Sequence, residues 1–302
     1  MMLDNQLHSL INMLRLNPLI KEGISLAVMR ETLDNVGGKS SRLSEVLCER
    51  LRIEGREIYH FHTSRAPIEK IILYLHGGGY VMGSSKSHRA LLERLCVSFG
   101  GSVFSVDYRL APEFPFPAAL DDVLNVYNWF LRDGLSPGQL VVAGDSAGGG
   151  LALATLINIR EEGLPQPACG MFISPWTDLA VTGESIESCA AIDPIVNKET
   201  LVKFRSMYLN GALATTPLAS PLYANLQGLC PILIQVGGSE ILLDDSLRLA
   251  SKLKEVEVDT CLQIWDDMIH VWHIFSPVLD KGKEAIKVLA SYANNHITSD
   301  YV

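Results

Sequence analysis

A serine in a tight, glycine-rich turn is the residue of this chain best suited to act as a nucleophile. Ser146 lies in a Gly-x-Ser-x-Gly pattern at residues 144–148, after the apolar run 140–143 and before the small-residue stretch 149–159. This order predicts a strand, a sharp turn and a helix, an arrangement that projects a serine hydroxyl out of the backbone. Such a turn leaves little room for neighbouring side chains, and the glycines and the alanine of the pattern meet that demand.

A glycine run upstream supplies the second element that a serine nucleophile needs, N–H groups that stabilise a developing oxyanion. The strand-like run 71–75 leads directly into His76-Gly77-Gly78-Gly79-Tyr80. Consecutive glycines after a buried strand allow a loop to turn its N–H groups into a cavity. A phosphate-binding loop is the alternative, but the chain has neither a P-loop pattern nor a dinucleotide fingerprint after the first strand. The two motifs together therefore favour acyl transfer.

The motifs resemble those of the hormone-sensitive-lipase family of α/β-hydrolases, over roughly residues 55–292. The resemblance rests on His76-Gly77-Gly78-Gly79, on Tyr108-Arg109-Leu110-Ala111-Pro112-Glu113 with Phe116-Pro117-Ala118-Ala119, and on Gly144-Asp145-Ser146-Ala147-Gly148-Gly149. Family members are mostly carboxylesterases that act on short or medium acyl esters. The resemblance implies that Gly78, Gly79 and Ala147 donate the N–H groups of the oxyanion hole.

Two histidines near the end of the chain compete for the role of catalytic base. Both follow the alternating run 260–265, which predicts a final strand, and the segment from residue 274 onward predicts a closing helix. His270 lies in the loop just beyond the strand, where a triad histidine can reach Ser146, whereas His273 lies one helical turn further on. We therefore expect His270 to be the base and His273 to pack or to face solvent.

Three carboxylates after the buried strand 231–236 could be the triad acid. The family commonly has an aspartate at the first acidic position of this stretch, which here is Glu240. We expect Glu240 to be the acid, because glutamate offers the imidazole N–H the same acceptor. Asp244 is the main alternative, and Asp245 is a further one. Asp244 also has a structural reason to exist, because a carboxylate in the first turn of a helix interacts favourably with the helix dipole.

Strands and helices alternate along the chain, which predicts an α/β-hydrolase fold with a mostly parallel central sheet and helices on both faces. Strands are expected at 56–62, 70–76, 102–108, 139–144, 168–174, 231–236 and 260–265, and helices at 87–99, 118–131, 146–162, 244–256 and 271–295. The expected catalytic residues then lie near the carboxyl ends of strands, where ligands bind in open α/β sheets.

Two segments fall outside this alternation. Residues 1–50 begin with apolar side chains at helical spacing, and an insertion at about 176–229 contains a predicted helix at 198–209. We expect a helical cap from both segments over a catalytic domain of residues 51–302. An amphipathic helix packed on the protein's own surface is the alternative for the N-terminal segment.

Composition limits the classes of partner and cofactor. The chain has 302 residues, 48% of them hydrophobic, and a formal net charge of -9, which argues against nucleic acid or an anionic membrane as a partner. The six cysteines form no C-x-x-C pair, and no histidine and acid cluster shows metal-ligand spacing, so we expect neither a metal nor another cofactor. Because neither a signal peptide nor a long apolar span is evident, we expect a cytoplasmic protein without a stable membrane anchor. A homodimer would be consistent with the family.

The expected function is that of a serine carboxylesterase acting on a small-molecule ester of short to medium acyl length, through an acyl-enzyme. A lactone hydrolase or an N-acetyl deacetylase using the same site is an alternative. A non-catalytic ligand-binding protein on a hydrolase scaffold is another, since fold does not imply function. Plant hormone receptors of the resembled family lack the triad histidine, and the presence of both Ser146 and His270 disfavours that interpretation.

Overall fold

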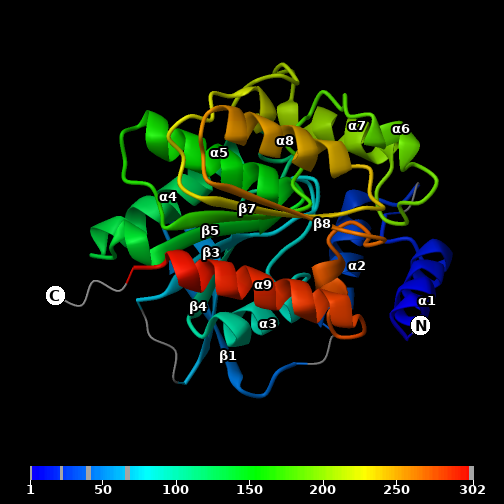
Figure 1. Cartoon of the computed structure of the whole chain (residues 1–302), viewed down its shortest axis with the longest axis horizontal. Helices are drawn as coiled ribbons and strands as arrows, with labels where there is room; N and C mark the ends of the chain where they lie inside the picture. Colours follow the sequence, from blue (N-terminus) through cyan, green and yellow to red (C-terminus); the bar gives the residue numbers. More distant parts are fainter. Residues whose placement is uncertain (1, 21–22, 39–41, 65–68, 299–302) are drawn as a thin grey trace.

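An eight-stranded, mostly parallel sheet runs through the centre of the molecule in the order β1-β2-β4-β3-β5-β6-β7-β8 (Figure 1). The computed structural model describes residues 2–20, 23–38, 42–64 and 69–298. The strands are β1 (Val46–Ile53), β2 (Arg56–Thr63), β3 (Ile71–Leu75), β4 (Ser102–Asp107), β5 (Leu140–Asp145), β6 (Cys169–Ile173), β7 (Ile232–Gly237) and β8 (Thr260–Trp265). β2 pairs antiparallel with β1 and with β4, and the remaining pairs are parallel. The predicted α/β-hydrolase fold is confirmed.

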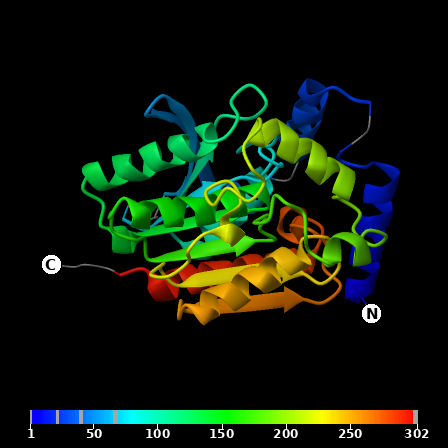
Figure 2. The same ribbon diagram turned by 90° about the horizontal axis from the view of Figure 1, so that it is seen from above.

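Helices cover both faces of this sheet (Figures 1 and 2). They are α1 (Met2–Leu16), α2 (Leu26–Gly38), α3 (Arg89–Phe99), α4 (Ala118–Arg132), α5 (Ala147–Glu161), α6 (Ser185–Ser188), α7 (Lys198–Leu209), α8 (Leu243–Glu255) and α9 (Asp280–His296), with 3-10 turns η1 (Pro137–Gln139), η2 (Pro221–Tyr223) and η3 (Trp272–Phe275). The hydrophobic core is divided between the two faces of the sheet, and successive side chains of β3 point alternately into the two parts. Leu73 packs in the same cluster as residues of α4, α5 and α8, whereas Tyr74 packs in the same cluster as residues of α3 and α9.

The first strand and the last helix differ from what the sequence predicts. β1 was not predicted, and the expected boundary between residues 50 and 51 falls inside this strand. The last helix begins at Asp280 rather than at residue 271, because the chain first forms the short turn η3 and then a non-helical stretch containing Pro277. Proline lacks the N–H that an α-helix interior requires and clashes with the preceding turn.

The N-terminal segment and the insertion after β6 lie beyond the carboxyl ends of the parallel strands (Figure 2). Arg30 of α2 connects the N-terminal segment to the rest of the fold. Its guanidinium donates to the carbonyl oxygens of Val81 at 2.7 Å and Ala111 at 2.8 Å, and pairs with both carboxylate oxygens of Glu113 at 2.8 and 2.7 Å. The hydrogen bond from Arg30 lowers the pKa of Glu113 to about 2. We call the N-terminal segment and residues 176–229 the cap.

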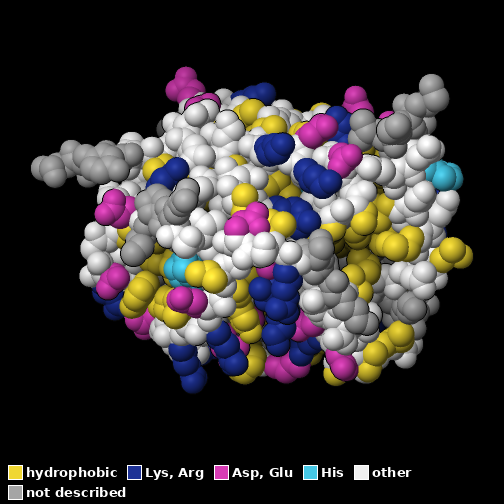
Figure 3. Space-filling model, turned by 90° about the horizontal axis from the view of Figure 1, so that it is seen from below, with side chains coloured by type: hydrophobic (Ala, Val, Ile, Leu, Met, Phe, Trp, Pro, Cys, Tyr) yellow, Lys and Arg dark blue, Asp and Glu magenta, His cyan; other side chains and the backbone are white. Residues whose placement is uncertain are grey.

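The surface is mixed in character despite the negative net charge. Seen from below, a band of Lys and Arg side chains runs across the molecule with acidic side chains beside it, and apolar side chains gather around a hollow on the side of α1 and α2 (Figure 3). Among the described helices, none is long and apolar enough to cross a membrane.

Candidate active site

Ser146 occupies the sharp turn between β5 and α5 with a backbone conformation of φ 53° and ψ −123°. Positive φ is uncommon for a residue with a side chain, and here it is held by the N–H of Ser146, which donates to the carbonyl of Ile173 at 2.9 Å. The turn also requires its glycines. A Cβ at Gly144 would lie 2.3 Å from the carbonyl oxygen of Gly148, and one at Gly148 would lie 2.1 Å from that of Leu75. The predicted strand, turn and helix are therefore present.

The structure brings Ser146, His270 and Glu240 together from segments far apart in the sequence. The Oγ of Ser146 lies 3.0 Å from Nε2 of His270, and Nδ1 of His270 lies 2.9 Å from Oε1 of Glu240. His270 and Glu240 are both buried. Because a carboxylate only accepts hydrogen bonds, it places the proton of a neutral His270 on Nδ1 and leaves Nε2 as the acceptor that faces the serine hydroxyl.

A second serine, Ser174, ties the acid to the loop that carries the histidine. Its hydroxyl donates to Oε2 of Glu240 at 2.7 Å and accepts from the N–H of Val271 at 3.2 Å. The N–H of Gly237 donates to the same carboxylate oxygen at 2.8 Å. Val271 has φ 47°, a conformation that is strained for a β-branched residue. Sequence reasoning did not single out Ser174, although its place directly after β6, at the carboxyl end of a core strand, is a signal that could have found it.

Opposing effects set the pKa of His270. Burial disfavours its charged form and lowers the pKa, but the carboxylate of Glu240, with a smaller contribution from Asp193, raises it more strongly. The pKa of His270 therefore lies above its usual value. The imidazolium form is thus stabilised where a base must hold a proton during acyl transfer.

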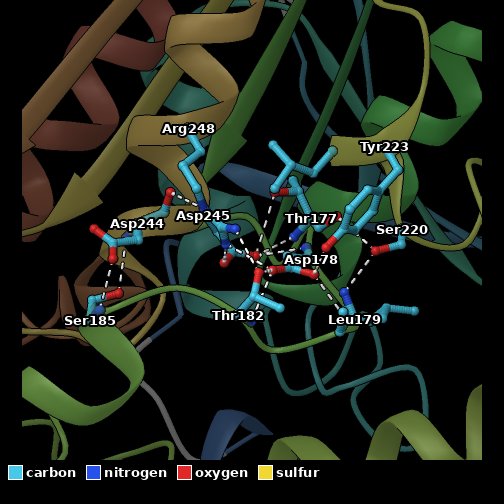
Figure 4. Close-up of polar contacts among 12 residues, drawn as sticks. Thr177, Asp178, Leu179, Thr182, Ser185, Ser220, Tyr223, Asp244, Asp245 and Arg248 are labelled. Atoms are coloured by element: carbon cyan, nitrogen blue, oxygen red, sulfur yellow. Dashed lines mark hydrogen bonds and ion pairs between the residues drawn. The ribbon is translucent and has the colours of Figure 1, made fainter. Parts of the chain in front are cut away.

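Asp244 lies at the start of α8 and bonds to the cap. Its carboxylate accepts from the N–H of Ser185 at 2.8 Å, and its own N–H donates to the hydroxyl of Ser185 at 3.0 Å (Figure 4). Within the described parts of the chain it makes no hydrogen bond with His270. Its position in the first turn of α8 is the one expected from the helix dipole.

Asp245 takes part in a buried polar network (Figure 4), and among the described residues it makes no hydrogen bond with His270. Its Oδ2 accepts from the N–H groups of Thr177 and Asp178, each at 2.8 Å, and its Oδ1 lies 3.1 Å from Arg248. Arg248 also pairs with Asp178 at 2.9 Å. Burial raises the pKa of Asp245 to about 7. This network joins the beginning of the cap insertion to α8.

His273, the competing histidine, is fully buried. Its Nε2 lies 2.8 Å from the side-chain oxygen of Gln235, so this nitrogen is the donor. Burial lowers the pKa of His273 to about 3, which keeps the ring neutral. Of the two expected alternatives for this residue, packing and exposure to solvent, the structure shows packing.

The glycine loop after β3 lies against Ser146 in a conformation that requires glycine. Gly78 has φ +120° and Gly79 has φ +64°. A Cβ at Gly78 would lie 2.1 Å from the carbonyl oxygen of Met82, and one at Gly79 would lie 2.3 Å from the ring of Phe204. No hydrogen-bond partner for the N–H of either glycine occurs among the described residues. Ala147 is the first residue of α5, so its N–H has no acceptor within the helix.

Asp145, beside the nucleophile, holds this loop in place. Its carboxylate accepts from the hydroxyl of Tyr74 at 2.8 Å and from the N–H of Gly77 at 3.1 Å, and it lies 3.1 Å from Nε2 of His88. Burial would raise the pKa of Asp145, but His88 outweighs it and the net shift is downward. Asp145 is therefore an ionised acceptor that connects the turn at Ser146 to the glycine loop.

A pocket with about 670 Å³ of empty space, its open mouth included, ends at Ser146. Its walls are mostly apolar and come from both cap segments as well as from the core. The lining includes Leu19, Ile20, Leu33, Gly78, Gly79, Ser146, Trp176, Ile195, Val196, Leu201, Phe204, His270 and Ile274.

Among the described residues, the group of His and acidic side chains close enough to share a metal ion is Glu49, His60 and His62, none of which lines this pocket.

Known proteins share both the sequence pattern and the fold of this chain. Residues 72–274 match a family model described as an α/β hydrolase fold. An acetyl-hydrolase of Streptomyces hygroscopicus is 42% identical over 74% of this chain and 75% of its own. An esterase of Acinetobacter venetianus is 33% identical over 80% and 79% of the two chains. The crystal structure of an esterase from the bacterial hormone-sensitive lipase family superposes with a TM-score of 0.94 at 41% identity, covering 97% of this chain and 99% of that one.

Proposed function

Because the chain belongs to the hormone-sensitive-lipase family of α/β-hydrolases and is a carboxylic ester hydrolase, we propose that Ser146, His270 and Glu240 are its catalytic triad. The observation that carries the proposal is the continuous chain of hydrogen bonds, 3.0 and 2.9 Å long, from Ser146 through His270 to Glu240 at the end of an apolar pocket. The proposed substrates are neutral esters of short to medium acyl length. The mostly apolar lining supports this class.

In the proposed mechanism, Nε2 of His270 takes the proton of Ser146 as the serine oxygen attacks the ester carbonyl. Glu240 stabilises the imidazolium that forms. When the tetrahedral intermediate collapses, His270 gives this proton to the leaving alcohol, and the acyl group stays on Ser146. Water then attacks the acyl-enzyme with His270 again as the base, which releases the carboxylic acid and restores the serine.

We propose that the N–H groups of Gly78, Gly79 and Ala147 bind the oxygen on which negative charge develops. Support comes from the lack of a hydrogen-bond partner for these N–H groups among the described residues, and from the place of the glycines and Ser146 in the lining of the same pocket. Donors fixed before the reaction need no reorganisation as charge develops, and the loss of one such donor costs about 3 kcal/mol.

A series of p-nitrophenyl esters from acetyl to palmitoyl tests the proposed activity and its chain-length range. We expect rapid turnover of the short and medium chains, covalent labelling of Ser146 by a fluorophosphonate, and loss of both in the variant Ser146→Ala. Labelling elsewhere, or turnover near the wild-type rate in Ser146→Ala, would remove Ser146 as the nucleophile. Labelling at Ser146 without ester turnover would instead favour a lactone or an N-acetyl amide as the substrate.

Matched amide variants test the proposed acid. Glu240→Gln removes the charge that faces His270, and we expect kcat to fall about 10³- to 10⁴-fold, as for the loss of a triad acid. Asp244→Asn keeps the same size at a carboxylate whose hydrogen bonds go to the cap, so we expect kcat to stay within about threefold. A severe effect of Asp244→Asn alone would overturn the assignment.

A further inference from the structure

A cluster of metal-binding side chains lies on the antiparallel pair β1–β2 at the edge of the sheet. His60 and His62 are two residues apart on β2, so both side chains lie on the same face of the strand. Glu49 of β1 pairs directly opposite His60. The carboxylate of Glu49 lies 3.4 Å from Nε2 of His62 and 4.0 Å from Nδ1 of His60. One ligand atom from each of the three residues therefore lies within 4.8 Å of the others.

A hydrogen bond to the backbone determines which nitrogen of His62 carries the proton. Nδ1 of His62 lies 3.3 Å from the carbonyl oxygen of Thr63, so this nitrogen carries the proton in the neutral ring. The unprotonated Nε2 then faces Glu49, and this nitrogen is buried without a hydrogen-bond partner in the described structure. Two lone pairs that face each other at this distance repel, and a cation between them would turn the repulsion into attraction.

His60 is held with its second nitrogen directed toward the same carboxylate. Its Nε2 lies 3.0 Å from the hydroxyl of Ser102, and its ring stacks on Phe104 with 4.1 Å between the ring centroids. Histidine ligands of metals commonly have a second partner of this kind, which sets the ring orientation. The rings of His60 and His62 also stack, with 4.5 Å between their centroids.

We propose that Glu49, His60 and His62 bind a divalent transition metal ion of the Zn²⁺ class. Two imidazoles and a carboxylate are a donor set that suits such ions. Ligand atoms around a tetrahedral zinc with bonds of about 2.1 Å lie about 3.4 Å apart, and the contact between Glu49 and His62 already has this spacing. The ring of His60, whose Nδ1 lies 4.0 Å from the carboxylate, must turn toward the ion to complete the set. The exposed Glu49 leaves the fourth position open to water.

The metal site is separate from the proposed chemistry. Phe61 of β2 pairs with Val103 near the start of β4, and Ser146 follows the far end of β5. At about 3.3 Å per residue, the two sites are about 16 Å apart along the strands alone. The bound ion would connect β1, the outermost strand, to β2 and would stabilise the edge of the sheet.

Zinc binding to the chelator-treated full-length protein, measured by calorimetry, tests the site. We expect one Zn²⁺ per chain, with affinity at least tenfold lower in Glu49→Gln and in His62→Gln. Because Glu49 is exposed, Glu49→Gln should fold normally even if a histidine variant does not. His8→Gln, at an exposed histidine of α1, is the matched control and should bind as the wild type does.

The melting temperature provides a second measurement. Zn²⁺ should raise the melting temperature of the wild-type protein and of His8→Gln but not that of Glu49→Gln, because an ion that binds only the folded state stabilises it. The absence of zinc binding would overturn the proposal. Binding that is equally strong in Glu49→Gln and His62→Gln would also overturn it, since the ion would then be held elsewhere.

Discussion

The hydroxyl of Ser174 donates a 2.7 Å hydrogen bond to Glu240. The same hydroxyl accepts from the N–H of Val271, the residue after His270, at 3.2 Å. One side chain on the loop after β6 therefore restrains both the carboxylate and the loop that carries the imidazole.

Replacing Ser174 by alanine tests this restraint. Ser174→Ala removes a hydrogen bond to a charged group, worth about 1.5 to 3 kcal/mol, so we expect kcat to fall at least about tenfold with little change in KM. Steady-state kinetics on a short ester measures both. Ser246→Ala is the matched control, because Ser246 is also buried but its hydroxyl has no partner among the described residues. Equal rates for the two variants would contradict the restraint.

The pH dependence of hydrolysis should follow the raised pKa of His270. The base works only when neutral, so kcat/KM should rise with pH through an apparent pKa above the usual value of about 6.5. Glu240→Gln removes the main contribution that raises this pKa. We expect the acid limb of its residual kcat/KM profile to move to lower pH while the plateau falls. An acid limb that stays in place would mean that Glu240 does not set the pKa of the base.

An alanine at Gly79 should damage the proposed oxyanion hole. Gly79 has φ +64°, which strains a residue with a side chain, and its added Cβ would meet the buried ring of Phe204 at 2.3 Å, so we expect the loop to shift and carry its N–H away from the reacting oxygen. We expect kcat to fall about 10²- to 10³-fold. Gly100→Ala is a close control, because Gly100 has φ +67° and open space around its Cβ. That variant should lose stability, measured by urea unfolding, but keep its kcat.

Leu19, Leu33 and Ile274 line both the active-site pocket and a second hollow beside α2. The second hollow is also lined by Val36, Leu91, Phe275, Pro277 and Val278. Leu33→Ala should open a passage between them and raise kcat/KM for decanoyl relative to butyryl esters by about tenfold. Val28→Ala, at an exposed position of the same helix, should leave the chain-length preference unchanged. An unchanged preference in Leu33→Ala would place the acyl chain elsewhere.

Local patterns allowed most of the fold, and the tight turn that carries Ser146, to be predicted. The turn at Ser146 is defined by glycines within five consecutive residues, and the expected helix at 198–209 matches α7 because its pattern is continuous. β1 was missed because Glu49, Arg50 and Arg52 interrupt its apolar alternation, which an edge strand tolerates. That omission also concealed the cluster with His60 and His62, whose ligands meet only when β1 and β2 pair.

Sequence spacing could not decide among the carboxylates after β7. Glu240 and Asp244 are four residues apart, and their different surroundings arise from contacts with distant segments. Ser174 and Gly237 hold Glu240 beside the histidine, whereas Ser185 bonds with Asp244 at the start of α8. Such contacts depend on how the loops after separate strands meet.

The division of the pocket between sheet and cap has a practical consequence for immobilising the enzyme. Leu19, Ile20 and Leu33, near the beginning of the chain, form part of the pocket wall, whereas α9 ends at His296 on the opposite side of the molecule from α1 (Figure 1). Attachment to a solid support on the side where α9 ends would keep the support away from this wall of the pocket. Attachment beside α1 would place the support close to it.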